Sequence, residues 1–177
     1  MTRRHQLSLF DEVHEAPPAG AYASSLAVPA GRYRLSLKRE ALDSSLLGYT
    51  FSRPSAAVRF FQQHLLDRPQ EVVLVVYLDP RHRPILFSEV NVGTSDRSLV
   101  DVQGILATGL LARAHGFMMA HNHPSGRPEP SLNDLLLTRR LVQAADLVGL
   151  TLCDHLILGE AGQWVSLRQK GECELPS

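Results

Sequence analysis

The chain has 177 residues, and 18 lysines and arginines balance 18 aspartates and glutamates, so its formal net charge is 0. Hydrophobic residues make up 44% of the chain, which is ordinary for a globular protein and excludes wholesale disorder. Two cysteines exclude a disulfide scaffold, and neutrality excludes a protein that coats nucleic acid with its whole surface. The sequence shows no secretory signal and no membrane-spanning stretch, so we expect a cytoplasmic protein with no membrane partner.

The first part of the chain is predicted to be a flexible tail. Residues 1–28 lack a sustained apolar period, and residues 29–177 are predicted to form one domain. An apolar island, Gln6-Leu7-Ser8-Leu9-Phe10, interrupts the tail. A five-residue peptide cannot form a core by itself, so it docks either on this domain or on another protein.

The predicted elements begin with an edge strand or extended arm, where apolar and polar residues alternate at 33–38. Residues 55–67 are predicted to form a helix that Ser55 caps and that carries one apolar stripe. The β-branched run at 71–79 is typical of a strand buried on both faces, and a turn connects it to a second strand at 85–92. These two strands are expected to form a hairpin.

The second half of the chain alternates helices and strands. Residues 99–115 are predicted to be helical, with Gly116 just beyond the last turn. A short buried strand at 117–120 and a loop rich in Pro and Gly at 121–130 follow.

The clearest helix spans residues 131–148 and opens with a capping-box-like pair, Ser131 and Asp134. Two strands, at 151–158 and 163–167, complete the pattern. The alternation predicts an α/β or α+β fold with a mixed sheet.

The sequence His121-Asn122-His123 at the end of a predicted strand is the central observation. In extended backbone, residues i and i+2 point to one face, so both imidazoles are able to reach a single cation. Asp134, in the first turn of the next helix, is placed to add a carboxylate. Two histidines and one carboxylate leave a tetrahedral zinc ion with an open position for water, as in catalytic sites. The alternative is a chance His-x-His pair, with Asp134 serving only the helix N-terminus.

A hydrolytic site also needs groups that move protons and stabilise charge. Glu89 is a candidate general base if its strand lies beside residues 117–123, because apolar neighbours would hold its pKa in a useful range. Ser131 is a candidate hydrogen-bond donor to an oxyanion. The alternatives are an exposed edge carboxylate for Glu89 and a purely capping role for Ser131.

These residues together resemble the RadC-like branch of the JAB/MPN metalloprotease superfamily. The superfamily pattern is an upstream Glu, then His-x-His, seven residues, Ser, two residues and Asp, and the same intervals separate His123, Ser131 and Asp134 here. Glu89 lies four residues before Gly93-Thr94, where RadC-like proteins carry the upstream Glu. The resemblance extends over roughly residues 52–171.

The resemblance implies a mixed sheet flanked by helices, of the cytidine-deaminase-like kind, and zinc-dependent hydrolysis of amide or isopeptide bonds in a peptide or protein. It implies zinc ligation by His121, His123 and Asp134, general-base catalysis by Glu89, and assistance to the tetrahedral intermediate by Ser131. RadC-like proteins are historically labelled DNA-repair proteins, so DNA is a second partner to consider. Residues 101–104 depart from the pattern, because they lack an Arg and a Glu that RadC-like chains usually have.

Asp154 is a candidate outer residue that orients a ligand imidazole. The alternative is a satisfied polar pair, Asp154 and His155, at the start of a strand.

The apolar island in the tail resembles the pentapeptide by which bacterial replication and repair proteins bind the DNA sliding clamp. By this resemblance Gln6, Leu7, Leu9 and Phe10 would contact the clamp, with the Leu and Phe side chains as anchors. The alternative is that they pack on the chain's own domain.

The sequence therefore predicts a zinc hydrolase with a clamp-binding tail. Three alternatives remain open at this point. They are a metal-dependent nuclease recruited to the sliding clamp, a non-catalytic interaction module, and a protein whose main function is the clamp peptide.

Overall fold

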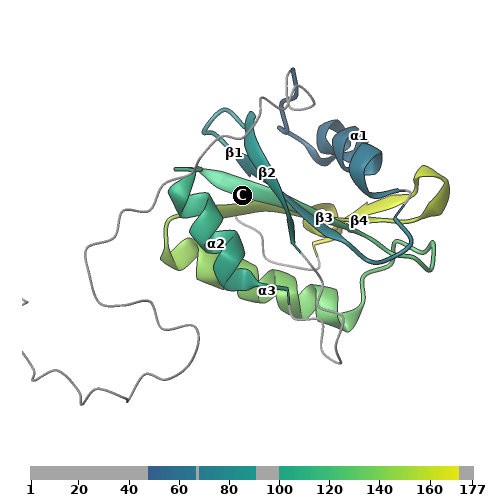
Figure 1. The fold of residues 1–177 in the computed structure, drawn as a ribbon. Helices are drawn as coiled ribbons and strands as arrows, with labels where there is room; N and C mark the ends of the chain where they lie inside the picture. The colour runs from purple at the N-terminus through teal and green to yellow at the C-terminus, as the bar shows by residue number, and fades with distance from the viewer. Residues whose placement is uncertain (1–47, 67, 91–99, 172–177) are drawn as a thin grey trace, which may run out of the picture. The chain divides into compact units, whose positions relative to one another are not determined.

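The computed structural model describes residues 48–66, 68–90 and 100–171. Within them, a five-stranded mixed sheet carries helices on both faces (Figure 1), which confirms the predicted fold class. The predicted tail, its apolar island and the arm at 33–38 lie outside the described residues. The boundary between residues 28 and 29 therefore stays a prediction.

The sheet has the strand order β2-β1-β3-β4-β5. β3 and β4 run parallel, and the other neighbours are antiparallel. The predicted hairpin is confirmed as the β1–β2 pair. The strands are β1 (Val73–Leu78), β2 (Pro84–Val90), β3 (Gly116–Asn122), β4 (Thr151–Leu158) and β5 (Trp164–Ser166).

Helix α1 covers one face of the sheet, and α2 and α3 cover the other (Figure 1). None of the helices in the described residues is long and apolar enough to cross a bilayer. The helices are α1 (Pro54–Leu65), α2 (Val102–Leu111), α3 (Leu132–Leu147) and the short α4 (Leu167–Lys170), with a 3-10 turn at Glu160–Gly162.

Strand β1 is buried along its whole length, because it has neighbours on both sides and helices on both faces. Its side chains alternate between two cores. Leu74, Val76 and Leu78 belong to the core beneath α1, and Val73, Val75 and Tyr77 to the core beneath α2 and α3. The same alternation determines which polar side chains of the sheet share a face with the histidines.

The predicted ends of α1 and α2 were wrong, because α2 spans Val102–Leu111 in place of 99–115 and α1 spans Pro54–Leu65 in place of 55–67. Ser55 does not cap α1, which begins at Pro54 after Arg53, and no side chain caps it. Proline suits a first helical position because its missing N–H needs no partner there. Gly116 does not follow α2 directly but opens β3. A Cβ at that position would lie 2.5 Å from the backbone oxygen of Thr151, so only glycine allows β3 and β4 to approach this closely.

Candidate metal centre

The side chains of His121, His123 and Asp134 converge at the end of β3. Nε2 of His121 lies 2.9 Å from Nε2 of His123, and 3.3 Å from Oδ1 of Asp134. Nε2 of His123 lies 3.5 Å from Oδ2 of Asp134. The ligand atoms all lie within 4.8 Å of one another, so the three predicted ligands are able to hold one metal ion.

Asn122, between the two histidines, points to the other face, as the strand alternation predicts. Its Oδ1 accepts a hydrogen bond from the amide of Val72 at 2.9 Å. Its Nδ2 donates to the carbonyls of Arg68 and Gln70, at 3.1 and 3.0 Å. These bonds tie the end of β3 to the segment that leads into β1, which holds both histidines in register.

The first turn of α3 places the carboxylate. Ser131 caps the helix, and its amide and hydroxyl donate to Oδ2 of Asp134 at 2.7 and 2.6 Å. In return, the hydroxyl accepts from the amide of Asp134 at 3.2 Å. The predicted capping box is confirmed. Because Asp134 already takes the hydroxyl proton of Ser131, donation by Ser131 to an oxyanion stays a prediction.

The donor set fits a metal ion. Nδ1 of His123 lies 2.7 Å from the carbonyl oxygen of Arg127, which can only accept, so Nδ1 carries the proton of the neutral ring. Nε2 of His123 then presents a lone pair to Nε2 of His121 and to the Asp134 carboxylate. Two ring nitrogens and a carboxylate around one point are the ligands that catalytic zinc prefers.

Burial keeps His121 ready to bind a metal. The residue is 1% exposed. Desolvation lowers its pKa to about 4; the Asp134 carboxylate opposes this shift and His123 adds to it. The imidazole is therefore neutral at neutral pH, as a metal ligand must be.

The structure does not bring Glu89 to these ligands. Glu89 was expected to act as the base only if its strand lay beside residues 117–123. It does not, because β1 lies between β2 and β3. Glu89 pairs with Leu74, which pairs with Ala120, so its side chain lies on the face opposite His121. Its surroundings are not apolar either, because the Glu89 side chain is 44% exposed and forms an ion pair with Arg68 at 3.0 Å.

Glu71, which the sequence analysis did not single out, interacts electrostatically with two of the candidate ligands. It precedes β1 by two positions, and Val73, two residues on, pairs with His121. The pKa of Glu71 is raised, chiefly by desolvation and then by the charge of Asp134, and His123 opposes the shift. Glu71 therefore lies within electrostatic reach of two ligands. In the sequence, Glu71 stands at the start of the predicted strand at 71–79. This position points to the histidines only once it is known that β1 pairs with β3.

Among the described residues, the Asp154 carboxylate has no hydrogen bond to a candidate ligand imidazole. Its carboxylate accepts from the Ser166 hydroxyl at 2.6 Å, and from the amides of His155 and Arg168 at 2.8 and 3.2 Å. These bonds fasten β5 and α4 to β4. The neighbouring side chain, His155, makes the contact instead, with Nε2 2.9 Å from Nδ1 of His121.

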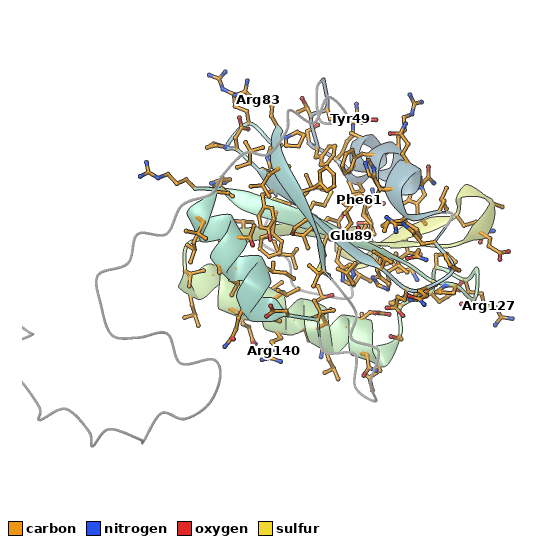
Figure 2. The ribbon with its side chains drawn as sticks, viewed as in Figure 1. Tyr49, Phe61, Arg83, Glu89, Arg127 and Arg140 are labelled. Atoms are coloured by element: carbon orange, nitrogen blue, oxygen red, sulfur yellow. The ribbon has the colours of Figure 1, made fainter. Side chains whose placement is uncertain are left out.

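A cleft of about 570 Å³ opens beside the ligand His123. The loop between β3 and α3 forms most of it, and the Arg127 side chain projects outward from this loop (Figure 2). The cleft is lined by His123, Ser125, Arg127, Pro128, Glu129 and Gln163. The cleft therefore leaves open space on the His123 side of the three candidate ligands.

Comparison with known proteins places this site in a family. The family described as "RadC-like JAB domain" matches residues 51–172. A protein named UPF0758 protein from Xanthomonas campestris pv. campestris (strain 8004) is 40% identical over 148 residues, which cover 81% of this chain and 65% of that protein. A second protein of this name, from Acidithiobacillus ferrooxidans (strain ATCC 53993 / BNL-5-31), is 44% identical over 118 residues, which cover 67% and 52%. The matched region thus spans less than two thirds of the length of these relatives.

Proposed function

The chain belongs to the RadC-like JAB domain family, and on this premise we propose that it is a zinc-dependent hydrolase that cleaves amide or isopeptide bonds in peptides or proteins. The convergence of His121, His123 and Asp134 is the observation that carries the proposal. A zinc ion, when bound, supplies Lewis acidity that activates water at neutral pH. The chain's own residues then have to position the substrate and accept a proton.

We assign the proton acceptor to Glu71 in place of Glu89. The raised pKa of Glu71 and its electrostatic interaction with Asp134 and His123 support this assignment. A carboxylate that binds a proton more readily than usual is suited to take one from the attacking water and return it to the leaving amine. Glu89 faces the other side of the sheet and is paired with Arg68.

The cleft beside His123 supports a peptide or protein substrate. It is open and is lined by both Arg127 and Glu129, so it offers partners of both charges to a polar backbone. Ser131 stands beside Asp134 and remains the proposed donor to the substrate oxyanion. That role requires its hydroxyl to leave Oδ2 of Asp134 during the reaction.

The proposal is tested by metal content and hydrolysis together. Protein purified without a His-tag or added metal is compared with His123→Ala by elemental analysis. Both are then offered a peptide library, a Lys-isopeptide substrate and DNA. Stoichiometric zinc that the variant lacks, with hydrolysis of the amide substrates, supports the proposal. Cleavage of DNA alone would support the nuclease instead, and no zinc even after titration would leave a non-catalytic module.

We also propose that residues 6–10 recruit this hydrolase to the sliding clamp, in a DNA repair or replication setting. The sequence Gln6-Leu7-Ser8-Leu9-Phe10 supports this proposal. It lies outside the described residues, so its support comes from the pattern alone.

A further inference from the structure

A chain of hydrogen bonds connects helix α3 to the ligand His121 through Thr138 and His155. Both side chains are 0% exposed. The Thr138 hydroxyl lies 2.6 Å from the carbonyl oxygen of Asp134 and 2.6 Å from Nδ1 of His155. On its other side, Nε2 of His155 lies 2.9 Å from Nδ1 of His121.

The direction of each bond follows from which atoms have protons to give. A carbonyl oxygen only accepts, so the Thr138 hydroxyl donates its one proton to Asp134. The same hydroxyl must therefore accept from Nδ1–H of His155. Complete burial disfavours the charged form of this ring, so the ring is neutral and its second nitrogen, Nε2, carries a lone pair.

The last bond then has only one direction. Nε2 of His155 accepts, so Nδ1 of His121 donates. A neutral His121 that is protonated at Nδ1 carries its lone pair at Nε2, the atom that faces His123 and Asp134.

We propose that Thr138 and His155 are positioning residues that lock His121 in the Nδ1–H tautomer and so present its Nε2 to the metal ion. This inference rests on the proposed metal centre and adds the device that prepares it. The carbonyl at the start of the relay belongs to Asp134, the residue that also supplies the carboxylate ligand. One turn of α3 thus positions both His121 and Asp134.

Removal of the Thr138 hydroxyl should reverse the relay. His155 would lose the acceptor for its Nδ1–H and would be free to carry its proton on Nε2 instead. That proton would point at Nδ1 of His121 and drive the His121 proton onto Nε2, where it blocks the ligand atom. Loss of such an outer partner typically weakens metal affinity by about 10- to 100-fold.

The test compares Thr138→Val, which keeps the shape but loses the hydroxyl, with Thr138→Ser, which keeps the hydroxyl. Histidine ring ¹⁵N shifts in the metal-free protein report each tautomer directly, and competition with a chromophoric chelator gives the zinc Kd. We expect Nδ1–H on His121 in the wild type and Thr138→Ser. In Thr138→Val we expect Nε2–H and a zinc Kd about 10- to 100-fold higher.

His123 is an internal control, because its Nδ1–H donates to the Arg127 carbonyl outside the relay and should not change. A second control places Thr138→Val in a His155→Gln background, where the relay is already broken and the additional effect should disappear. Thr138→Ala replaces Thr138→Val if circular dichroism shows that valine disturbs the fold.

The outcomes separate this inference from the proposed function. A wild-type His121 protonated at Nε2, or the same tautomer and zinc Kd in the valine and serine variants, would overturn the relay even if zinc binds. Absence of zinc binding by the wild type would overturn the metal centre, while the metal-free tautomers would still decide the relay.

Discussion

The amide and the hydroxyl of Ser131 both donate to Oδ2 of Asp134, at 2.7 and 2.6 Å. The same carboxylate lies 3.3 Å from His121 through its other oxygen. The capping of α3 and the placement of a metal ligand are therefore one arrangement. The two roles considered for Asp134 are compatible, because the cap holds the carboxylate in the orientation that the metal site needs.

Replacement of Ser131 by alanine should therefore affect stability and metal binding together. The loss of a helix cap lowers the free energy of unfolding by about 1 kcal/mol. Freed from its partner, the Asp134 carboxylate should bind zinc about 10-fold more weakly. Urea unfolding and chelator competition measure the two effects. Ser131→Thr keeps the hydroxyl and should stay near the wild type; an alanine variant with unchanged zinc affinity would contradict the coupling.

Glu71→Gln should abolish most hydrolysis without loss of zinc. The amide cannot accept the proton, so we expect kcat to fall by about 10²- to 10⁴-fold. Glu89→Gln is the matched control, because Glu89 lies on the opposite face and contacts Arg68. It should retain hydrolysis within a few-fold. The reverse ranking, with zinc content equal in both variants, would restore Glu89 as the base.

The metal-free protein should lose stability in mild acid. Burial lowers the pKa of His121 from its ordinary value of 6.5 to about 4, and burial also lowers the pKa of His155. Between pH 6.5 and about pH 4, the unfolded chain therefore binds more protons than the folded one. The stability contributed by the neutral rings is thus complete above pH 6.5 and falls as the pH drops toward 4. Each such ring contributes a slope on the order of 1 kcal/mol per pH unit.

Urea unfolding of the metal-free protein at several pH values measures this slope. His121→Gln removes one of the two rings and should flatten it. A slope equal to that of the wild type would show that His121 is not titrating in this range.

Asp154→Asn should weaken the fold but leave the metal centre intact. The carboxylate holds Ser166 and Arg168 and contacts no ligand imidazole. Loss of these charged hydrogen bonds should cost about 1.5–3 kcal/mol. Thermal unfolding tests the first half of this prediction, and the zinc Kd of the folded variant tests the second. A large change in zinc Kd with His121 still protonated at Nδ1 would return Asp154 to the role first considered for it.

The tail is tested by a pull-down with the sliding clamp. The double change Leu9→Ala and Phe10→Ala removes the two apolar anchors and should abolish capture. Ser8→Ala, in the same peptide, is the control and should retain it. Equal capture by all three proteins would show that residues 6–10 do not bind the clamp.

The candidate ligands could be predicted from local sequence because their geometry is local. Strand alternation put His121 and His123 on one face, and the capping pattern put Asp134 in the first turn of α3. The Asn122 side chain points away for the same reason. Each of these relations spans a few residues of backbone, whose period is set by the residue types.

The choice between Glu71 and Glu89, and between Asp154 and His155, depended on strand pairing that no local pattern records. Both glutamates lie at the ends of a hairpin, and only the position of β1 next to β3 places Glu71 on the histidine side. Asp154 and His155 are adjacent, so a shift of one residue in the β3–β4 register exchanges their faces. The sequence by itself predicted the described helices and strands, apart from some of their ends, and the three candidate ligands, because those follow from backbone periodicity. The tertiary structure decided which further side chains reach the ligands, because the register between strands is set by packing across the whole sheet.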